Sequence, residues 1–270
     1  MNNVFDIRRF GKYLAYDLRR IRSSYGLTFL ILALMPVVIY TVTLAFGMVN
    51  GNGWAVPNSD SRLAVFFITT GVLLLSYPAS CYGSITAKKP GSSWLLLPAS
   101  SFEKFLSLLL ITLIVLPVAY AVLYFGSDAL LGLAGHGYGQ GIATRLFVEK
   151  MSVNVTSGGI EGTGGSAYPL YLVFITTALT FMLGAVLFKK FKVALTILCL
   201  MALSMVLSLV GVFVATHTDA EWWKNLFTWV IGEDEDTVLR RMKILANVSA
   251  WVVIALLGLG TFFRIKTLKH

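Results

Sequence analysis

The sequence predicts an all-α membrane protein with six transmembrane helices and both termini in the cytoplasm. Three observations lead to this prediction: six long apolar runs, the absence of charge within them, and the clustering of basic residues between them. Each run is roughly 18–23 residues long, which is the length that an α-helix needs to cross a bilayer core of about 30 Å. None contains Lys, Arg, Asp, Glu or His, and they cover about 27–47, 63–85, 105–126, 168–188, 193–215 and 246–263.

The bulk composition agrees with a chain embedded in a lipid bilayer. Of the 270 residues, 57% are hydrophobic, which excludes a soluble domain and a disordered chain. The net charge of +9 is explained by membrane topology, so no nucleic-acid partner is expected. Cys81 and Cys199 both fall inside predicted spans and are too few for a disulfide framework or a zinc site.

The basic residues separate clearly between the two sides of the six-span arrangement. Fifteen of the 22 Lys and Arg residues fall in the four segments that share a side with the N-terminus, together with only three acidic residues. The remaining seven lie on the other side with ten acidic residues. Because cytoplasmic segments of membrane proteins carry the excess of Lys and Arg, this count predicts that both termini are cytoplasmic.

Residues 1–26 are predicted to form an amphipathic helix at the cytoplasmic membrane surface, ahead of a six-span domain at 27–270. Its apolar positions are spaced 3, 4, 4 and 3 residues apart and so share one helix face; they are Ile7, Phe10, Leu14, Leu18 and Ile21. Six basic side chains are expected to meet lipid headgroups: Arg8, Arg9, Lys12, Arg19, Arg20 and Arg22. A simple surface anchor and a docking lever for a cytoplasmic partner both fit this pattern.

Two of the predicted outer loops stand out. The second, 127–167, is long and rich in glycine, but no Gly-Lys-Ser/Thr follows the glycines, so it is not a phosphate-binding loop and its function stays open. The third is expected to form short helices at the outer face between spans five and six. Thr218 and Glu221 form a predicted capping box, Gly232 is a predicted C-cap, and a second short helix should follow residues 233–236.

The connection between the second and third spans combines an apolar stretch with a strong helix start. Trp94–Leu97 is apolar in a segment that should be exposed to water, and Pro98 ends this run. Ser100 and Glu103 have the spacing of a capping box, and Lys104 marks the cytoplasmic edge of the third span. A well-capped ordinary connector fits every residue, while the apolar stretch favours packing against another surface.

The run Leu95-Leu-Leu-Pro-Ala-Ser-Ser-Phe-Glu-Lys-Phe-Leu106, after Lys88-Lys89, resembles membrane subunits of type-2 ABC transporters. The resemblance implies an amphipathic cytoplasmic helix before the first span, short outer helices between spans five and six, and a coupling helix that docks on an ATPase. It also implies a multi-pass location in a bacterial inner membrane. The residues expected to contact the ATPase are Trp94, Leu96, Pro98, Ser100, Glu103 and Lys104.

The expected function is that of a permease subunit of an ATP-driven ABC exporter, acting with a separate ATPase and a second permease subunit as a homo- or heterodimer. ATP and magnesium would bind the partner ATPase, because this chain has no Walker motif. No enzymatic activity, catalytic residue, cofactor or metal is expected here; the three histidines, His136, His217 and His270, are scattered. A non-transporting sensor or assembly protein with an outer binding loop is the alternative, and an intramembrane enzyme ranks last. The transported substrate stays open.

Overall fold

The computed structural model describes residues 5–51, 57–86, 94, 96–133, 170–217, 228 and 235–267. These residues form helices and short connections, and no strand occurs among them. The all-helical prediction is therefore confirmed for this part of the chain. The predicted Thr218–Glu221 cap and most of the glycine-rich loop, from residue 134 to 169, lie outside the described residues.

The first two helices meet at a bend that was not predicted from the sequence. Helix α1 spans Ile7–Ala33 and begins at Asp6, whose side chain accepts a hydrogen bond from the Arg8 amide at 2.8 Å. Helix α2 spans Met35–Val49, and the two helices are bent by 41°. The break falls at Leu34, inside the predicted first span, because Pro36 lacks an amide donor and its ring disfavours a continuous helix. No break occurs at the expected boundary near residue 26.

The second and third expected spans are also helical. Helix α3 spans Ser59–Cys81 and is followed by the 3₁₀ turn η1 at Gly83–Thr86. Helix α5 spans Ser101–Leu110, a π-helical turn η2 covers Ile111–Val115, and α6 spans Leu116–Leu133. The wide turn lies just before Pro117, whose missing amide donor favours a local change in hydrogen bonding. Helix α6 continues to Leu133, so residues 127–133 at the start of the predicted second outer loop are helical.

Three further helices are described after residue 169. Helix α8 spans Leu170–Leu187, α9 spans Lys192–His217 and α11 spans Glu235–Thr267. Phe191, in the turn before α9, has a φ of 47°. The second short outer helix expected before residue 246 is not separate, since α11 is one helix of 33 residues without a proline.

By length and apolar composition, four of the described helices can cross a membrane, and five if the bent pair α1 and α2 counts as one span. The four are Asp60–Cys81, Ser101–Gly132, Lys192–Val214 and Ile244–Thr267, whereas Tyr171–Leu187 is shorter. The chain thus has the helices of a polytopic membrane protein, and the six-span count remains a prediction.

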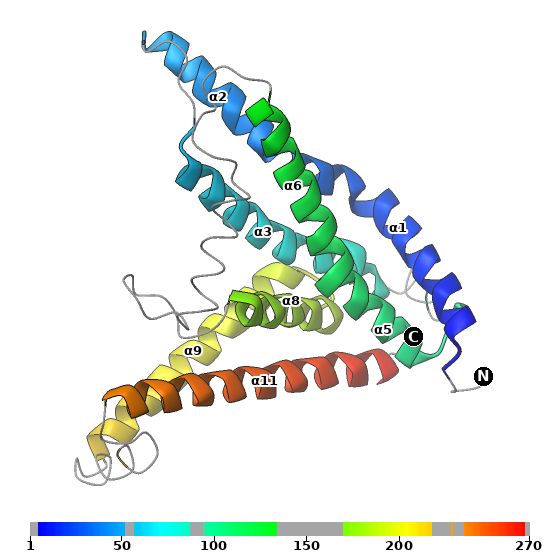
Figure 1. Cartoon of the computed structure of the whole chain (residues 1–270). Helices are drawn as coiled ribbons and strands as arrows, with labels where there is room; N and C mark the ends of the chain where they lie inside the picture. Colours follow the sequence, from blue (N-terminus) through cyan, green and yellow to red (C-terminus); the bar gives the residue numbers. More distant parts are fainter. Residues whose placement is uncertain are drawn as a thin grey trace.

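Helices α1, α3 and α8 and the α5–η2–α6 segment pack together (Figure 1), and the buried core lies between them. Its centre is aromatic: Phe66 stacks on Tyr120 and contacts Tyr124 edge to face, and Tyr25 contacts Tyr77 in the same way. Figure 1 also shows that the beginning of α1 and the end of α11 lie at one end of the molecule, close to α5.

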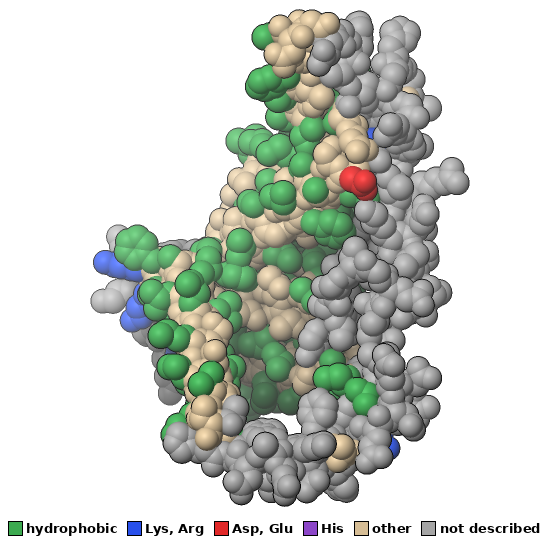
Figure 2. Space-filling view, turned by 90° about the vertical axis from the view of Figure 1, so that its left-hand side faces the viewer, with side chains coloured by type: hydrophobic (Ala, Val, Ile, Leu, Met, Phe, Trp, Pro, Cys, Tyr) green, Lys and Arg blue, Asp and Glu red, His purple; other side chains and the backbone are tan. Residues whose placement is uncertain are grey.

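Helix α9 contributes little to this core. It packs on α8 and touches α3, and all its residues from Ile197 to Phe213 are exposed. Hydrophobic side chains dominate the molecular face shown in Figure 2, and few charged side chains of described residues appear there. This apolar surface is available to lipid or to another membrane helix.

Candidate functional site at the start of α5

Helix α5 begins with a complete capping box. The Glu103 amide donates to Ser100 Oγ at 3.2 Å, and the Ser100 amide donates to Glu103 Oε2 at 2.8 Å. These two bonds satisfy backbone donors that the first helical turn would otherwise leave without a partner. The capping box predicted from the sequence is therefore confirmed, and it fixes where the helix starts relative to Pro98.

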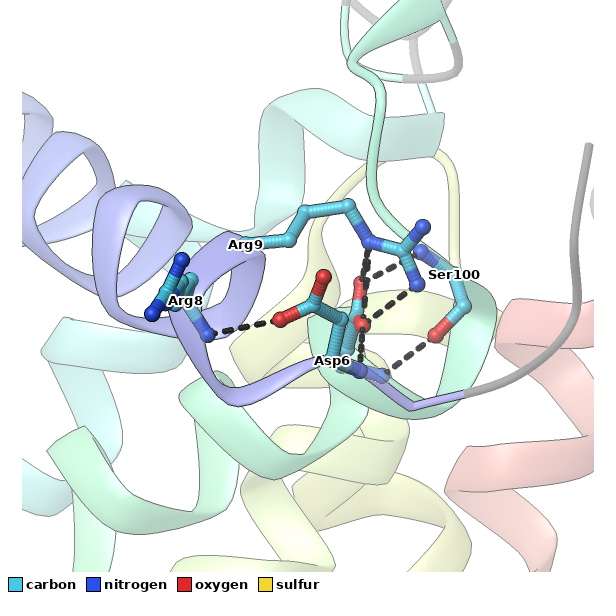
Figure 3. Close-up of polar contacts among 5 residues, drawn as sticks. Asp6, Arg8, Arg9 and Ser100 are labelled. Atoms are coloured by element: carbon cyan, nitrogen blue, oxygen red, sulfur yellow. Dashed lines mark hydrogen bonds and ion pairs between the residues drawn. The ribbon is translucent and has the colours of Figure 1, made fainter.

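Glu103 also ties α5 to the beginning of α1. Arg9 donates from Nε to both Glu103 carboxylate oxygens, at 3.0 and 2.8 Å, and its Nη2 lies 2.6 Å from Oε1. The Asp6 amide donates to the same oxygen at 3.0 Å. Figure 3 shows Arg9 reaching from α1 to the start of α5, where Ser100 lies. Because the Glu103 side chain is completely buried, the cap and the ion pair act as one polar unit.

A second contact joins the connecting segment to α1. Trp94 is 4% exposed, and its indole N–H donates to the Tyr13 hydroxyl at 3.1 Å. Lys104 Nζ donates to the Trp94 carbonyl at 2.9 Å and lies 4.6 Å from the centre of the indole ring. Trp94 is therefore an anchor inside this chain, fixed to both α1 and α5.

The six residues expected to contact an ATPase fall into two groups in the structure. Trp94, Glu103 and Lys104 are buried against α1 and α5 within this chain. Leu96 is 83% exposed and Pro98 is also exposed, while Ser100 is partly exposed. A partner that bound this segment would therefore meet Leu96 and Pro98 directly, and the remaining contacts hold this exposed tip in place. Whether an ATPase binds there stays a prediction.

Asp17 forms a buried polar cluster that the sequence analysis missed. Its Oδ2 accepts from the Tyr82 hydroxyl at 2.9 Å and from Ser107 Oγ at 3.2 Å, and Oδ1 lies 3.0 Å from Arg20 Nη2. These contacts join α1, the end of α3 and α5. The signal was the spacing of Phe10 and Asp17, seven residues apart, which puts the carboxylate on the buried helix face.

The buried stripe of α1 differs from the predicted one. Phe10, Tyr13, Asp17 and Tyr25 are buried, whereas Ile7 is 67% exposed. The six basic residues expected at the membrane surface also divide. Arg9 and Arg20 enter ion pairs with buried carboxylates, and the exposed ones are Arg8, Lys12, Arg19 and Arg22.

A further buried ion pair joins the beginning of α3 to the last part of α6, at the ends of these helices that lie away from Asp17 and Glu103. Arg62 Nη1 is 2.9 and 3.2 Å from the two Asp128 carboxylate oxygens, and the residues are 1% and 0% exposed. The Tyr124 hydroxyl donates to the Arg62 carbonyl at 2.7 Å. Arg62 lies between the first two apolar runs and Asp128 lies after the third, so the two residues fall in two different predicted outer loops. The structure instead pairs them between α3 and α6.

Other kinds of chemistry find little support in the described residues. Among these residues, no group of three or more His, Cys, Asp and Glu side chains is arranged to hold a metal ion. Cys81 is buried and Cys199 is exposed, and both are free thiols.

Comparison of the chain with protein-family models, with curated proteins and with solved structures finds no match. Function is therefore inferred from the contacts around α5 alone.

Proposed function

We propose that this chain is the membrane-spanning permease subunit of an ATP-driven exporter of the type-2 ABC superfamily. In this proposal it works with a separate ATPase subunit, which binds ATP and magnesium, and with a second permease subunit. The observation that carries the proposal is the exposed tip formed by Leu96 and Pro98. This tip is fixed to the helix bundle through buried contacts on both sides.

The contacts around the tip suit the transmission of a displacement. On one side, Trp94 and Glu103 bind α1 through Tyr13 and Arg9. On the other side, the rings of Phe102 and Phe105 lie 6.4 and 5.5 Å from that of Phe262 on α11. A push on the tip would therefore move the ends of α1, α5 and α11 together, because packed elements move as rigid bodies.

The energy for transport would come from the partner subunit. The six predicted spans contain no Asp, Glu, Lys, Arg or His, which ion-coupled transporters usually keep at membrane depth. The excess of Lys and Arg around the tip supports a cytoplasmic position, where ATP is available. The resemblance to type-2 ABC permeases supports the inner membrane of a bacterium as the location.

The test is co-purification and ATP hydrolysis with the ABC ATPase encoded by a neighbouring gene. Leu96→Asp should reduce recovery of the ATPase about tenfold or more, since a charge at the centre of an apolar contact costs several kcal/mol. The combined change Ser100→Ala and Glu103→Ala should leave the ATPase bound but uncouple hydrolysis from transport. Loss of the cap costs about 0.5–2 kcal/mol. Glu103→Ala also removes the ion pair with Arg9, so the double variant loosens both the start of α5 and its contact with α1.

Phe191→Asp is the matched control, because Phe191 is 80% exposed in a different turn on the same predicted side of the membrane. This variant should bind the ATPase like the parent. If no ATPase co-purifies with the parent chain, the permease assignment fails and the sensor alternative gains support. If Leu96→Asp and Phe191→Asp weaken binding equally, the tip is an ordinary connector.

A further inference from the structure

A groove of about 550 Å³ lies between α1 and the η2–α6 segment, a size typical of small-ligand sites. The residues that line it include Ile21, Tyr25, Gly26 and Leu30 on α1, and Val115 and Ala119 on the other wall. Of the described lining residues, Arg22 alone is charged. The groove therefore combines a long apolar wall with one cation.

The deep part of the groove is closed and apolar. Tyr25, Ile111 and Leu116 are 2%, 1% and 5% exposed. The Tyr25 hydroxyl is hydrogen-bonded to Ser76 on α3, so its polar atom already has a partner. Gly26 has no side chain, and a Cβ placed there would meet only Arg22 Cγ within 4 Å, at 3.7 Å. This glycine leaves the groove open next to Arg22, and a hydrocarbon chain fits such a surface.

Arg22 has no acidic partner among the described residues, in contrast to Arg9 and Arg20. The contacts of Arg9 with Glu103 and of Asp17 with Ser107 show that α1 and α5 run in the same direction. Arg22 lies farther along this direction, at the level of the predicted third span. An arginine at that depth is costly unless an anion compensates it.

We propose that this groove holds one anionic glycerophospholipid, with an acyl chain along α1 and η2–α6 and the headgroup phosphate on Arg22. The apolar wall accounts for the chain, and the cation accounts for the charge preference. A basic residue near a membrane contributes about 1 kcal/mol toward an anionic lipid, which corresponds to roughly fivefold tighter binding. The proposal rests on the membrane location alone and holds whether or not an ATPase binds the chain.

The test is native mass spectrometry of the full chain purified in detergent with equal amounts of phosphatidylglycerol and phosphatidylcholine. The parent should keep one lipid per chain, with phosphatidylglycerol favoured about fivefold. Arg22→Gln should keep the lipid but lose the preference for the anionic headgroup. Gly26→Leu should fill the groove and lose both lipids, while helix formation is favoured by the loss of glycine.

Two matched controls lie on the same helix. Arg19→Gln removes another exposed cation that does not line the groove, and Gly11→Leu adds a side chain where nothing lies within 4 Å. Both should bind lipid like the parent. The proposal is overturned if the parent keeps no lipid, if Arg22→Gln keeps the preference, or if Arg19→Gln loses it equally. Stabilisation of the parent against heat by inorganic phosphate alone, without lipid, would also overturn it.

Discussion

Three carboxylates are completely buried in the described part of the chain: Asp17, Glu103 and Asp128. Each lies 2.6–3.0 Å from an arginine nitrogen, on Arg20, Arg9 and Arg62 respectively. A buried charge is costly without a partner, so these pairs restrict how the helices can pack. Arg9 is 31% exposed, whereas Arg62 is 1% exposed. Solvent screening therefore weakens the Arg9–Glu103 pair more than the Arg62–Asp128 pair.

The Arg62–Asp128 pair gives a prediction at the scale of single residues. Asp128→Leu should lower the free energy of unfolding by about 3–5 kcal/mol, because it leaves the Arg62 guanidinium buried without its carboxylate. Arg62→Leu combined with Asp128→Leu should recover most of this loss, since a packed apolar pair needs no charge compensation. Thermal unfolding of the purified variants in detergent measures both effects.

Arg19→Leu is the control for this experiment, because an exposed side chain usually changes stability by less than about 0.5 kcal/mol. A double variant as unstable as Asp128→Leu would contradict the argument. In that case the contribution of the site comes from other contacts, such as the hydrogen bond from Tyr124 to the Arg62 carbonyl.

At the scale of whole helices, the apolar runs and local capping signals were readable in the sequence. The Ser100–Glu103 spacing predicted a helix start that the structure confirms, because a cap depends only on residues within one turn. The bend at Leu34 was not predicted, although Pro36 was visible, since an uninterrupted apolar run was read as one straight span. The partner Asp128 of Arg62, and the partners Tyr82 and Ser107 of Asp17, could not be predicted, because they lie 65 or more residues away in sequence.

Among the described glycines, Gly184 on α8 lies closest to a side chain of another helix, that of Thr196 on α9. This contact gives a prediction at the scale of helices. A Cβ at Gly184 would lie 1.9 Å from Thr196 Oγ1 and 2.9 Å from its Cβ. Gly184→Ala should therefore force the two helices apart and cost about 1–3 kcal/mol of stability. Thermal unfolding should show this loss, and adding Thr196→Gly should restore much of it.

Gly211→Ala on α9 is the matched control, because a Cβ there meets nothing within 4 Å. This change should be neutral or slightly stabilising, since alanine favours a helix over glycine. If Gly184→Ala is equally neutral, α8 and α9 are not packed as closely as the structure places them.

At the scale of the whole molecule, the helices divide into a tightly packed part and an open part. The part around α1, α3 and α5–η2–α6 holds the aromatic core and all three buried ion pairs, and buried residues of α8 pack against this core. The other part contains α9 and most of α11, whose side chains are largely exposed. The number of membrane crossings depends on α8, whose 18 residues would be about 27 Å long, slightly less than a bilayer core of about 30 Å.

The last prediction tests whether α8 crosses the membrane. Ser59 is the first residue of α3, and Phe191 follows α8 in an exposed turn, so three candidate crossings separate them: α3, α5–η2–α6 and α8. An odd number of crossings places the two positions on opposite sides. Cysteines introduced singly as Ser59→Cys and Phe191→Cys, in a Cys199→Ser background, should therefore differ in their reaction with a membrane-impermeant thiol reagent.

The positive-inside rule gives the direction of the difference: Ser59→Cys should react in intact cells, and Phe191→Cys only after the membrane is opened. Cys81 is buried and should stay silent, and the Cys199→Ser parent without an added cysteine is the control. The reverse pattern would invert the orientation. Reaction of both positions in intact cells would mean that α8 does not span, which leaves an odd number of crossings and puts the two termini on opposite sides.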